Sequence, residues 1–231
     1  MASDIMRETY KTAEIAAALE HGNFTVFRRN LNSDKLNVLP PFADAGRGEY
    51  CYAQIAEMAI HLAAASTHTR EVAHMVTWGI LDTLHRKAAS TPEYREAIFA
   101  FMARQDELEP LQHCPAGLYP LMLAPEMFFG EGLISRDPEN RTWALYSISG
   151  ASAGMMSRIK FMQEDGEQPL SLKDVRKAAY HLATSSASDE RTRYHFGEAA
   201  TRPYLLDLTG IFTRFEDILR FRLEARTAGR R

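Results

Sequence analysis

The sequence is poor in cysteine, in long apolar runs and in net charge, and each shortage excludes a class of protein. Its 231 residues include two cysteines, Cys51 and Cys114, too few for a disulfide framework or a cysteine-rich metal site. No apolar stretch reaches the roughly 18 residues that a membrane span needs, and the first residues lack the basic-then-apolar order of a secretory signal. We therefore expect a cytoplasmic protein with free thiols and no membrane partner.

The charge balance gives no global argument for a nucleic-acid partner. The formal net charge is −3, and 45% of the residues are hydrophobic and 25% charged, which is typical of a globular protein long enough to bury a core. Residues 1–88 hold nine basic and ten acidic side chains. A surface for DNA therefore has to arise from the segregation of charge and not from its excess.

Two short helical segments with a turn between them open the chain. The first, Thr12–Leu19, starts at a threonine whose hydroxyl can cap the first helical turn. The second, Phe24–Leu31, is expected to point Val26 and Leu31 inward and its polar residues outward. Adjacent arginines near a helix start suit contacts with phosphates or with guanine edges in a major groove. The outward residues are Thr25, Arg28 and Arg29.

A glycine turn and a β-prone run follow the two segments. Pro40-Pro41 breaks the helical pattern, Gly46-Arg47-Gly48 favours a turn, and Tyr50–Tyr52 favours a short strand. A longer helical pattern then runs from Ala53 to Ala65. Helix, turn, helix, hairpin and helix is the order of a winged helix-turn-helix, with Arg47 expected at the tip of the wing.

Residues 12–76 resemble the DNA-binding domain of the MerR-type regulators of bacterial and phage genomes. In that family a small alanine in the first helix is followed, nine residues later, by a threonine that opens the recognition helix, and Ala16 and Thr25 keep this interval. The proline pair, the glycine turn and the tyrosines described above follow the family's order. The sequence departs from it at Glu20 and His21, where the family carries glycine and then valine.

The resemblance implies a sequence-specific transcriptional regulator that binds double-stranded DNA, pairs as a homodimer and carries no cofactor. A DNA-binding packaging or excision factor of phage type, which can carry the same winged helix, is the alternative. Phe27 takes the place of the family's arginine, so the basic residues are displaced by one and two positions. The residues implied to contact DNA are Thr12, Thr25, Arg28, Arg29, Lys35, Arg47, Tyr50 and Tyr52.

The rest of the chain predicts a mainly α protein with a small α+β second half. Residues 1–88 are assigned to the winged helix-turn-helix, 89–117 to a helix and a linker rich in proline and glycine, and 118–231 to the α+β domain. In that domain a β-hairpin is expected from two strands, Gly132–Ser135 and Thr142–Ile148. The other expected elements are an edge strand at Leu118–Leu123 and helices at Met155–Met162, Leu172–Ala183 and Tyr204–Leu223.

A serine motif raises a second, different function. Gly150-Ala151-Ser152-Ala153-Gly154 matches G-x-S-x-G between a predicted strand and a predicted helix, and Asp174 or Asp189 with His195 would complete a triad in the right order. The fold that this motif needs does not fit, because residues 1–112 are predicted to be almost entirely helical. We therefore expect no enzyme. Among the eight histidines, none of the pairs on helical segments is spaced i, i+4, and we expect no metal site.

The last predicted helix leaves two interpretations open. Its apolar face is broad for a small domain, so it either forms the homodimer interface, over residues 203–223, or closes the core of its own domain. The apolar residues are Leu205, Leu208, Ile211, Phe212, Phe215, Ile218, Leu219 and Leu223.

Overall fold

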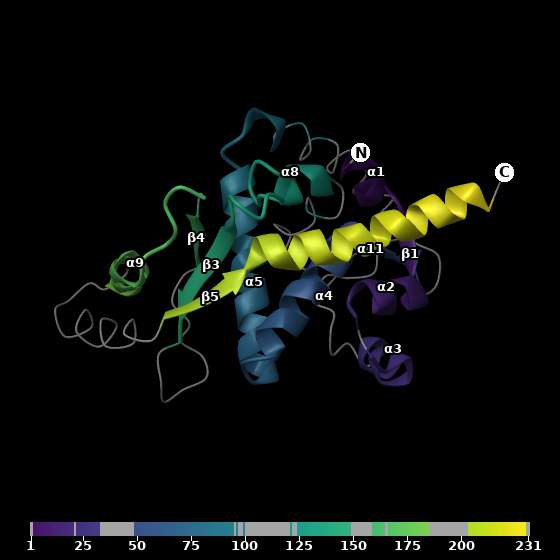
Figure 1. The fold of residues 1–231 in the computed structure, drawn as a ribbon, viewed down its shortest axis with the longest axis horizontal. Helices are drawn as coiled ribbons and strands as arrows, with labels where there is room; N and C mark the ends of the chain where they lie inside the picture. Colours follow the sequence, from purple (N-terminus) through teal and green to yellow (C-terminus); the bar gives the residue numbers. More distant parts are fainter. Residues whose placement is uncertain are drawn as a thin grey trace. The chain divides into compact units, whose positions relative to one another are not determined.

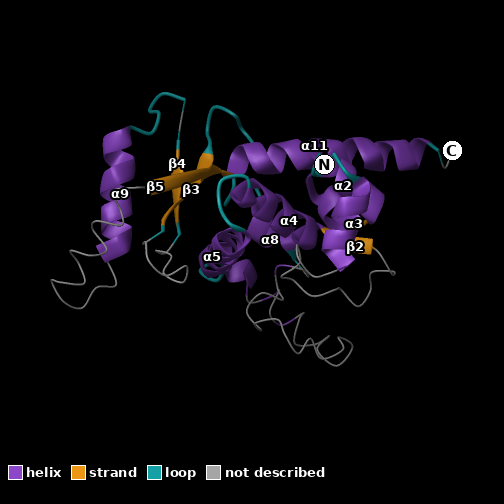
Figure 2. Cartoon of the chain, turned by 90° about the horizontal axis from the view of Figure 1, so that it is seen from below, coloured by secondary structure: helices purple, strands orange, loops and turns teal. Residues whose placement is uncertain are grey.

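The computed structural model describes residues 2–20, 22–32, 49–94, 96, 99, 121, 124–148, 159–164, 166–184 and 203–229 as a mixed α/β chain, mainly helical, with small antiparallel sheets (Figure 1, Figure 2). Its contacts divide it into two compact units. The first unit holds residues 1–60, 84–133 and 211–231, and the second holds residues 61–83 and 134–210. The predicted linker at 109–117 lies outside the described residues.

The first unit begins with two strands and three helices. Helix α1 (Ala2–Arg7) leads into strand β1 (Thr9–Lys11), which is followed by α2 (Thr12–Ala18), α3 (Phe24–Asn32) and strand β2 (Glu49–Cys51). The strand predicted near residues 50–52 is present, but its partner is β1. The two pair antiparallel, with Tyr10 opposite Tyr50. The predicted glycine turn at 46–48 lies outside the described residues.

Aromatic side chains fill the core of the first unit. Helix α11 (Leu208–Ala228) buries Phe212 and Phe215, and α8 (Pro125–Phe129) buries Phe129. The ring of Tyr52, the first residue of α4 (Tyr52–Ala65), lies 5.6 Å from Phe215 and 5.7 Å from Phe129 between centroids. Its hydroxyl makes a short hydrogen bond with the buried Glu216 carboxylate. The last helix therefore packs into a core that it shares with Tyr52 of the N-terminal part of the chain, and not into a core of the predicted domain at 118–231 alone. The homodimer interface predicted at 203–223 stays a prediction.

The second unit contains a three-stranded antiparallel sheet in the order β4–β3–β5. Strand β3 (Thr142–Ser147) is central and pairs with β4 (Lys160–Gln163) and β5 (Pro203–Asp207). Helix α9 (Leu172–Thr184), predicted at 172–183, packs on it. Helices α4 and α5 (Arg70–Ala88) contribute residues to both units.

Three sequence predictions for this region are wrong. Gly132–Ser135 forms turns and not a strand, so the predicted hairpin with 142–148 does not form. Residues 160–162, predicted as the end of a helix at 155–162, belong to β4 (160–163). Residues 204–207, predicted as the start of the last helix, belong to β5 (203–207). Short apolar runs do not distinguish a strand from a helix by periodicity, and the sheet pairing decides here. Leu121, inside the predicted edge strand, is helical, and the other residues of that strand lie outside the described ranges.

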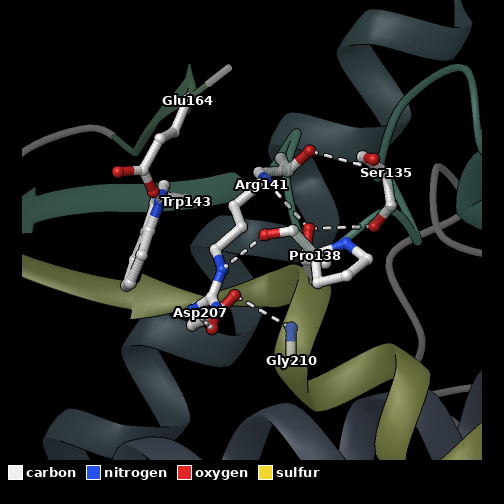
Figure 3. A network of polar contacts seen from close by, with 9 residues as sticks. Ser135, Pro138, Arg141, Trp143, Glu164, Asp207 and Gly210 are labelled. Atoms are coloured by element: carbon white, nitrogen blue, oxygen red, sulfur yellow. Dashed lines mark hydrogen bonds and ion pairs between the residues drawn. The ribbon is translucent and has the colours of Figure 1, made fainter. Parts of the chain in front are cut away.

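Asp207 joins the sheet to the first turn of α11 (Figure 3). Its Oδ1 accepts a hydrogen bond from the Gly210 amide at 2.9 Å, which caps the helix, and its Oδ2 accepts one from Arg141 Nη1 at 3.1 Å. Arg141 Nε also donates to the Pro138 carbonyl at 3.0 Å. The Arg141 guanidinium thus links the turn at Pro138 to Asp207 at the start of α11.

The neighbouring polar groups satisfy one another. Thr209 Oγ1 donates to the Ser135 carbonyl at 2.9 Å and accepts from the Thr142 amide at 2.8 Å. Trp143 Nε1 donates to Glu164 Oε2 at 2.7 Å. This network fixes the loop at 135–141 and has the character of a structural cap and not of a reactive site.

Candidate nucleic-acid interface

The helix pair α2 and α3 is the first element of the candidate interface. Helix α2 buries Ile15, Ala16 and Ala18, and the small alanine side chains let α3 pack closely against it. The Lys11 amide donates to Glu14 Oε2 at 2.8 Å, which closes the first turn of α2. The helix begins at Thr12 with Lys11 at the N-cap, so the predicted cap at Thr12 is one residue late.

The turn between the two helices has a defined geometry. Glu20 has a φ of 50°, in the left-handed region that glycine adopts most easily. Asn23 then starts α3: its Oδ1 accepts a hydrogen bond from the Val26 amide at 3.1 Å, and its carbonyl accepts one from the Phe27 amide at 3.0 Å. An asparagine N-cap satisfies amides that a helix start would otherwise leave open.

Helix α3 separates an anchoring face from an outward face. Phe27 is fully buried, whereas Thr25, Arg28 and Arg29 are exposed. At 100° per residue the three polar residues lie within one side of the helix and Phe27 lies nearly opposite. No acidic side chain in the described part of the chain forms an ion pair with Arg28 or Arg29. Within the part of the chain that the structure describes, the outward face therefore presents two guanidinium groups without an ion-pair partner, on a helix anchored by Phe27.

The remaining residues predicted to contact DNA are less exposed than those of α3 or lie outside the described residues. Thr12 and Tyr50 are half-buried, and Lys35 and Arg47 lie outside the described residues. Tyr52 has no exposed surface, because its ring fills the aromatic core. A side chain in that position has no access to DNA, so Tyr52 is removed from the candidate surface.

Arg226, near the end of α11, links this helix to α2 and β1, and the sequence did not predict this contact. Its Nε donates to Glu14 Oε1 at 2.7 Å, its Nη2 makes a short bond with Glu14 Oε2, and its Nη1 donates to the Thr9 carbonyl at 3.1 Å. Its guanidinium carbon lies 5.4 Å from the centre of the buried Tyr10 ring. In Figure 1 the end of α11 lies beside β1 and α2, and Figure 2 again shows it beside α2.

Removing this guanidinium should destabilise the first unit. Partial burial opposes ionisation of Glu14, but hydrogen bonds from Arg226 and the Lys11 amide outweigh it, so the Glu14 pKa lies below 4.5. Arg226→Ala should cost about 1.5–3 kcal/mol near pH 7, because it leaves a half-buried carboxylate without its cation. Since the folded pKa is depressed, the difference from wild type should shrink as the pH falls below about 4.5. Urea unfolding checks this, and the exposed Arg222→Ala is the matched control. An equal loss in both variants would contradict the assignment.

The second unit contains a buried histidine that supports no metal site. His61 is 3% exposed, and its Nδ1 has no hydrogen-bond partner in the described part of the chain. Its ring lies 6.2 Å from that of His74, whose Nε2 accepts from Trp78 Nε1 at 3.0 Å. Within the described residues there is no group of three or more His, Cys, Asp or Glu that could hold a metal ion. Burial, with a smaller effect of His74, lowers the His61 pKa to about 4.

This buried imidazole predicts a loss of stability in mild acid. The folded pKa lies below the unfolded value of 6.5, so the unfolded chain binds a proton first as the pH falls. The contribution of neutral His61 to the free energy of unfolding is complete above about pH 6.5. It should fall by about 2 kcal/mol between pH 7.5 and pH 5. In urea unfolding, His61→Gln should have a flatter pH dependence than wild type. Identical curves for the two proteins would show that His61 does not titrate as described.

The alternative serine site cannot be placed. Ser152, Asp189 and His195 lie outside the described residues, and Asp174 accepts a hydrogen bond from the Ser171 hydroxyl at the start of α9.

Among the described residues no helix is both long and apolar enough to cross a membrane. The described cysteine, Cys51, is a buried free thiol whose pKa is raised to about 11 by burial.

Comparisons with protein-family models, with curated proteins and with solved structures gave no match to this chain.

Proposed function

We propose that the chain is a sequence-specific DNA-binding regulator that inserts α3 into a major groove. The observation that carries the proposal is the division of α3, with Phe27 fully buried on one side and Thr25, Arg28 and Arg29 exposed on the other. A recognition helix needs this division, because its inner side must hold the helix rigidly while its outer side reads base edges.

The surrounding elements support a helix-turn-helix of the winged kind. Strand β1 stands directly before the helix pair, and β2, which follows it in the chain, returns to pair with β1. The pairing fixes both ends of the segment that holds the two helices. The positive φ of Glu20 also falls where the resembled MerR-type family carries glycine, which is the residue that this backbone conformation favours.

The proposed chemistry is direct readout combined with phosphate contact. Arg28 and Arg29 offer planar donors that match the O6 and N7 acceptors of guanine, and Thr25 at the first turn can contact a phosphate or a base. Lys35 and Arg47, the other basic residues that the resemblance implies, lie outside the described residues. A homodimer on two half-sites would supply the affinity that a single domain lacks.

Selection of duplexes from a random pool with the full chain tests the proposal. We expect a defined motif to be enriched, with two half-sites if the chain binds as a dimer. The selected duplex should bind at least about a thousandfold more tightly than a scrambled one, as specific DNA-binding proteins do. A pool that stays random after repeated rounds, under conditions in which the chain is folded, would reject sequence-specific binding.

A further inference from the structure

One side of α9 in the second unit gathers basic side chains. Lys173, Arg176 and Lys177 follow an i, i+3, i+4 pattern, and Tyr180 continues it at i+7, so all four lie on one side of the helix. All four are exposed, Tyr180 to 51%. We call these four residues the α9 basic face.

The opposite side of α9 is already occupied. Val175, Ala178 and Ala179 pack with Leu145 of β3 in a buried apolar cluster. Figure 2 shows α9 beside the sheet of its own unit, with one long side turned away from the strands. Because the apolar side is committed to this core, the helix cannot bind a lipid bilayer by inserting that side. The exposed side of α9 can therefore contact a partner only through its charged side chains and Tyr180.

The charge of the α9 basic face is not neutralised within the described part of the chain, where none of its three cations has an ion-pair partner. The one acid of the helix, Asp174, lies about 100° around from Lys173 and is engaged at the helix start. Its amide donates to Ser171 Oγ at 3.1 Å, and its carboxylate accepts from the same hydroxyl.

We propose that the α9 basic face binds the phosphate backbone of duplex DNA, as a contact separate from α3 and independent of base sequence. Lysine, arginine and tyrosine are side chains that commonly contact DNA phosphates. The chain as a whole has a net charge of −3, so a local group of three cations that have no ion-pair partner among the described residues is a specific feature and not part of a general excess. The inference takes its partner, duplex DNA, from the proposed function.

The test compares the salt dependence of binding to a fluorescent duplex of random sequence, about 20 base pairs long. Removing one phosphate interaction reduces the slope of log K against log salt by about 0.9, so Lys173→Gln/Arg176→Gln/Lys177→Gln should reduce it by about two to three. The control, Arg7→Gln/Arg70→Gln/Arg222→Gln, changes the net charge equally at exposed positions outside α3 and α9 and should leave the slope nearly unchanged. Circular dichroism of both variants, compared with wild type, checks that they are folded.

Three results would overturn the inference. The first is a slope in the α9 variant equal to that of wild type or of the control. The second is displacement of the duplex by polyglutamate at equal charge concentration, which indicates an acidic protein as partner. The third is stronger binding to vesicles that contain phosphatidylserine than to the duplex. Failure of this contact alone leaves the selected motif and the effect of Arg28 and Arg29 intact, whereas a wild-type chain that binds no duplex rejects the proposed function as well.

Discussion

Replacing both arginines of α3 should abolish recognition of the selected duplex without unfolding the protein. Arg28 and Arg29 are exposed and form no ion pair among the described residues, so their removal leaves no buried group unsatisfied. Removing one base-edge interaction should cost about 1–3 kcal/mol of discrimination. The double variant Arg28→Ala/Arg29→Ala should therefore lose on the order of a hundredfold or more in affinity for the selected duplex, measured by fluorescence anisotropy.

The ratio of the affinity for the selected duplex to that for a scrambled duplex, here called the specificity ratio, distinguishes the loss of base contacts from the loss of charge alone. Affinity for a scrambled duplex should fall much less than affinity for the selected one, because phosphate contacts elsewhere on the surface remain. Arg222→Ala, which removes an exposed arginine from α11, serves as the control and should leave the ratio unchanged. If the double variant retains the wild-type ratio, α3 is not the recognition helix.

Replacing Phe27 should have the largest effect on stability within the helix pair. The side chain is fully buried and anchors α3, so Phe27→Ala removes its packing and leaves a cavity. Substitutions of this kind cost about 3–5 kcal/mol, a large part of the stability of a typical domain. We expect a loss of this size in urea unfolding, and weaker binding to every duplex because the folded population falls.

The neighbouring phenylalanine provides a matched control on the same helix. Phe24 is 45% exposed at the first position of α3, so Phe24→Ala should change the free energy of unfolding by less than about 1 kcal/mol. Equal effects of the two substitutions would show that α3 does not pack through Phe27.

Helical periodicity allowed much of the helical framework to be predicted from the sequence. Helices α2, α3, α4 and α9 all lie within one or two residues of their predicted positions, because each carries a repeated apolar pattern. The outward side chains of α3 were predicted from the same pattern. The residue predicted to point inward, Val26, is only half-buried, and the buried anchor is Phe27. A single residue's inward position in so short a helix depends on the neighbouring helix and not on periodicity alone.

The strand pairing and the long-range contacts could not be predicted in this way. Local patterns indicated β2 and β3, but β1 has only three residues and pairs with β2 across about forty residues, so no local pattern indicates that pairing. Tyr52 was expected on a wing, but its ring packs among phenylalanines from distant segments. The contact between Arg226 and Glu14 joins residues 212 apart, and no local signal indicates such a pair.

The role of α11 changes how the homodimer should be tested. Truncation at Thr201 would remove β5 together with α11 and its buried Phe212, Phe215 and Leu219, so the fragment should not fold. The dimer stays a prediction, and light scattering of the full chain is the appropriate measurement. We expect twice the chain mass of 26.1 kDa, with or without DNA.

The most direct test of the central claim follows the arginine side chains themselves. In nuclear magnetic resonance spectra of the full chain, the Nε–H signals of Arg28 and Arg29 can be assigned by substitution and observed as the selected duplex is added. We predict that both signals shift and that the Arg222 signal does not. Unchanged Arg28 and Arg29 signals, in a sample in which other residues report saturated DNA binding, would contradict the assignment of α3 as the helix that reads DNA.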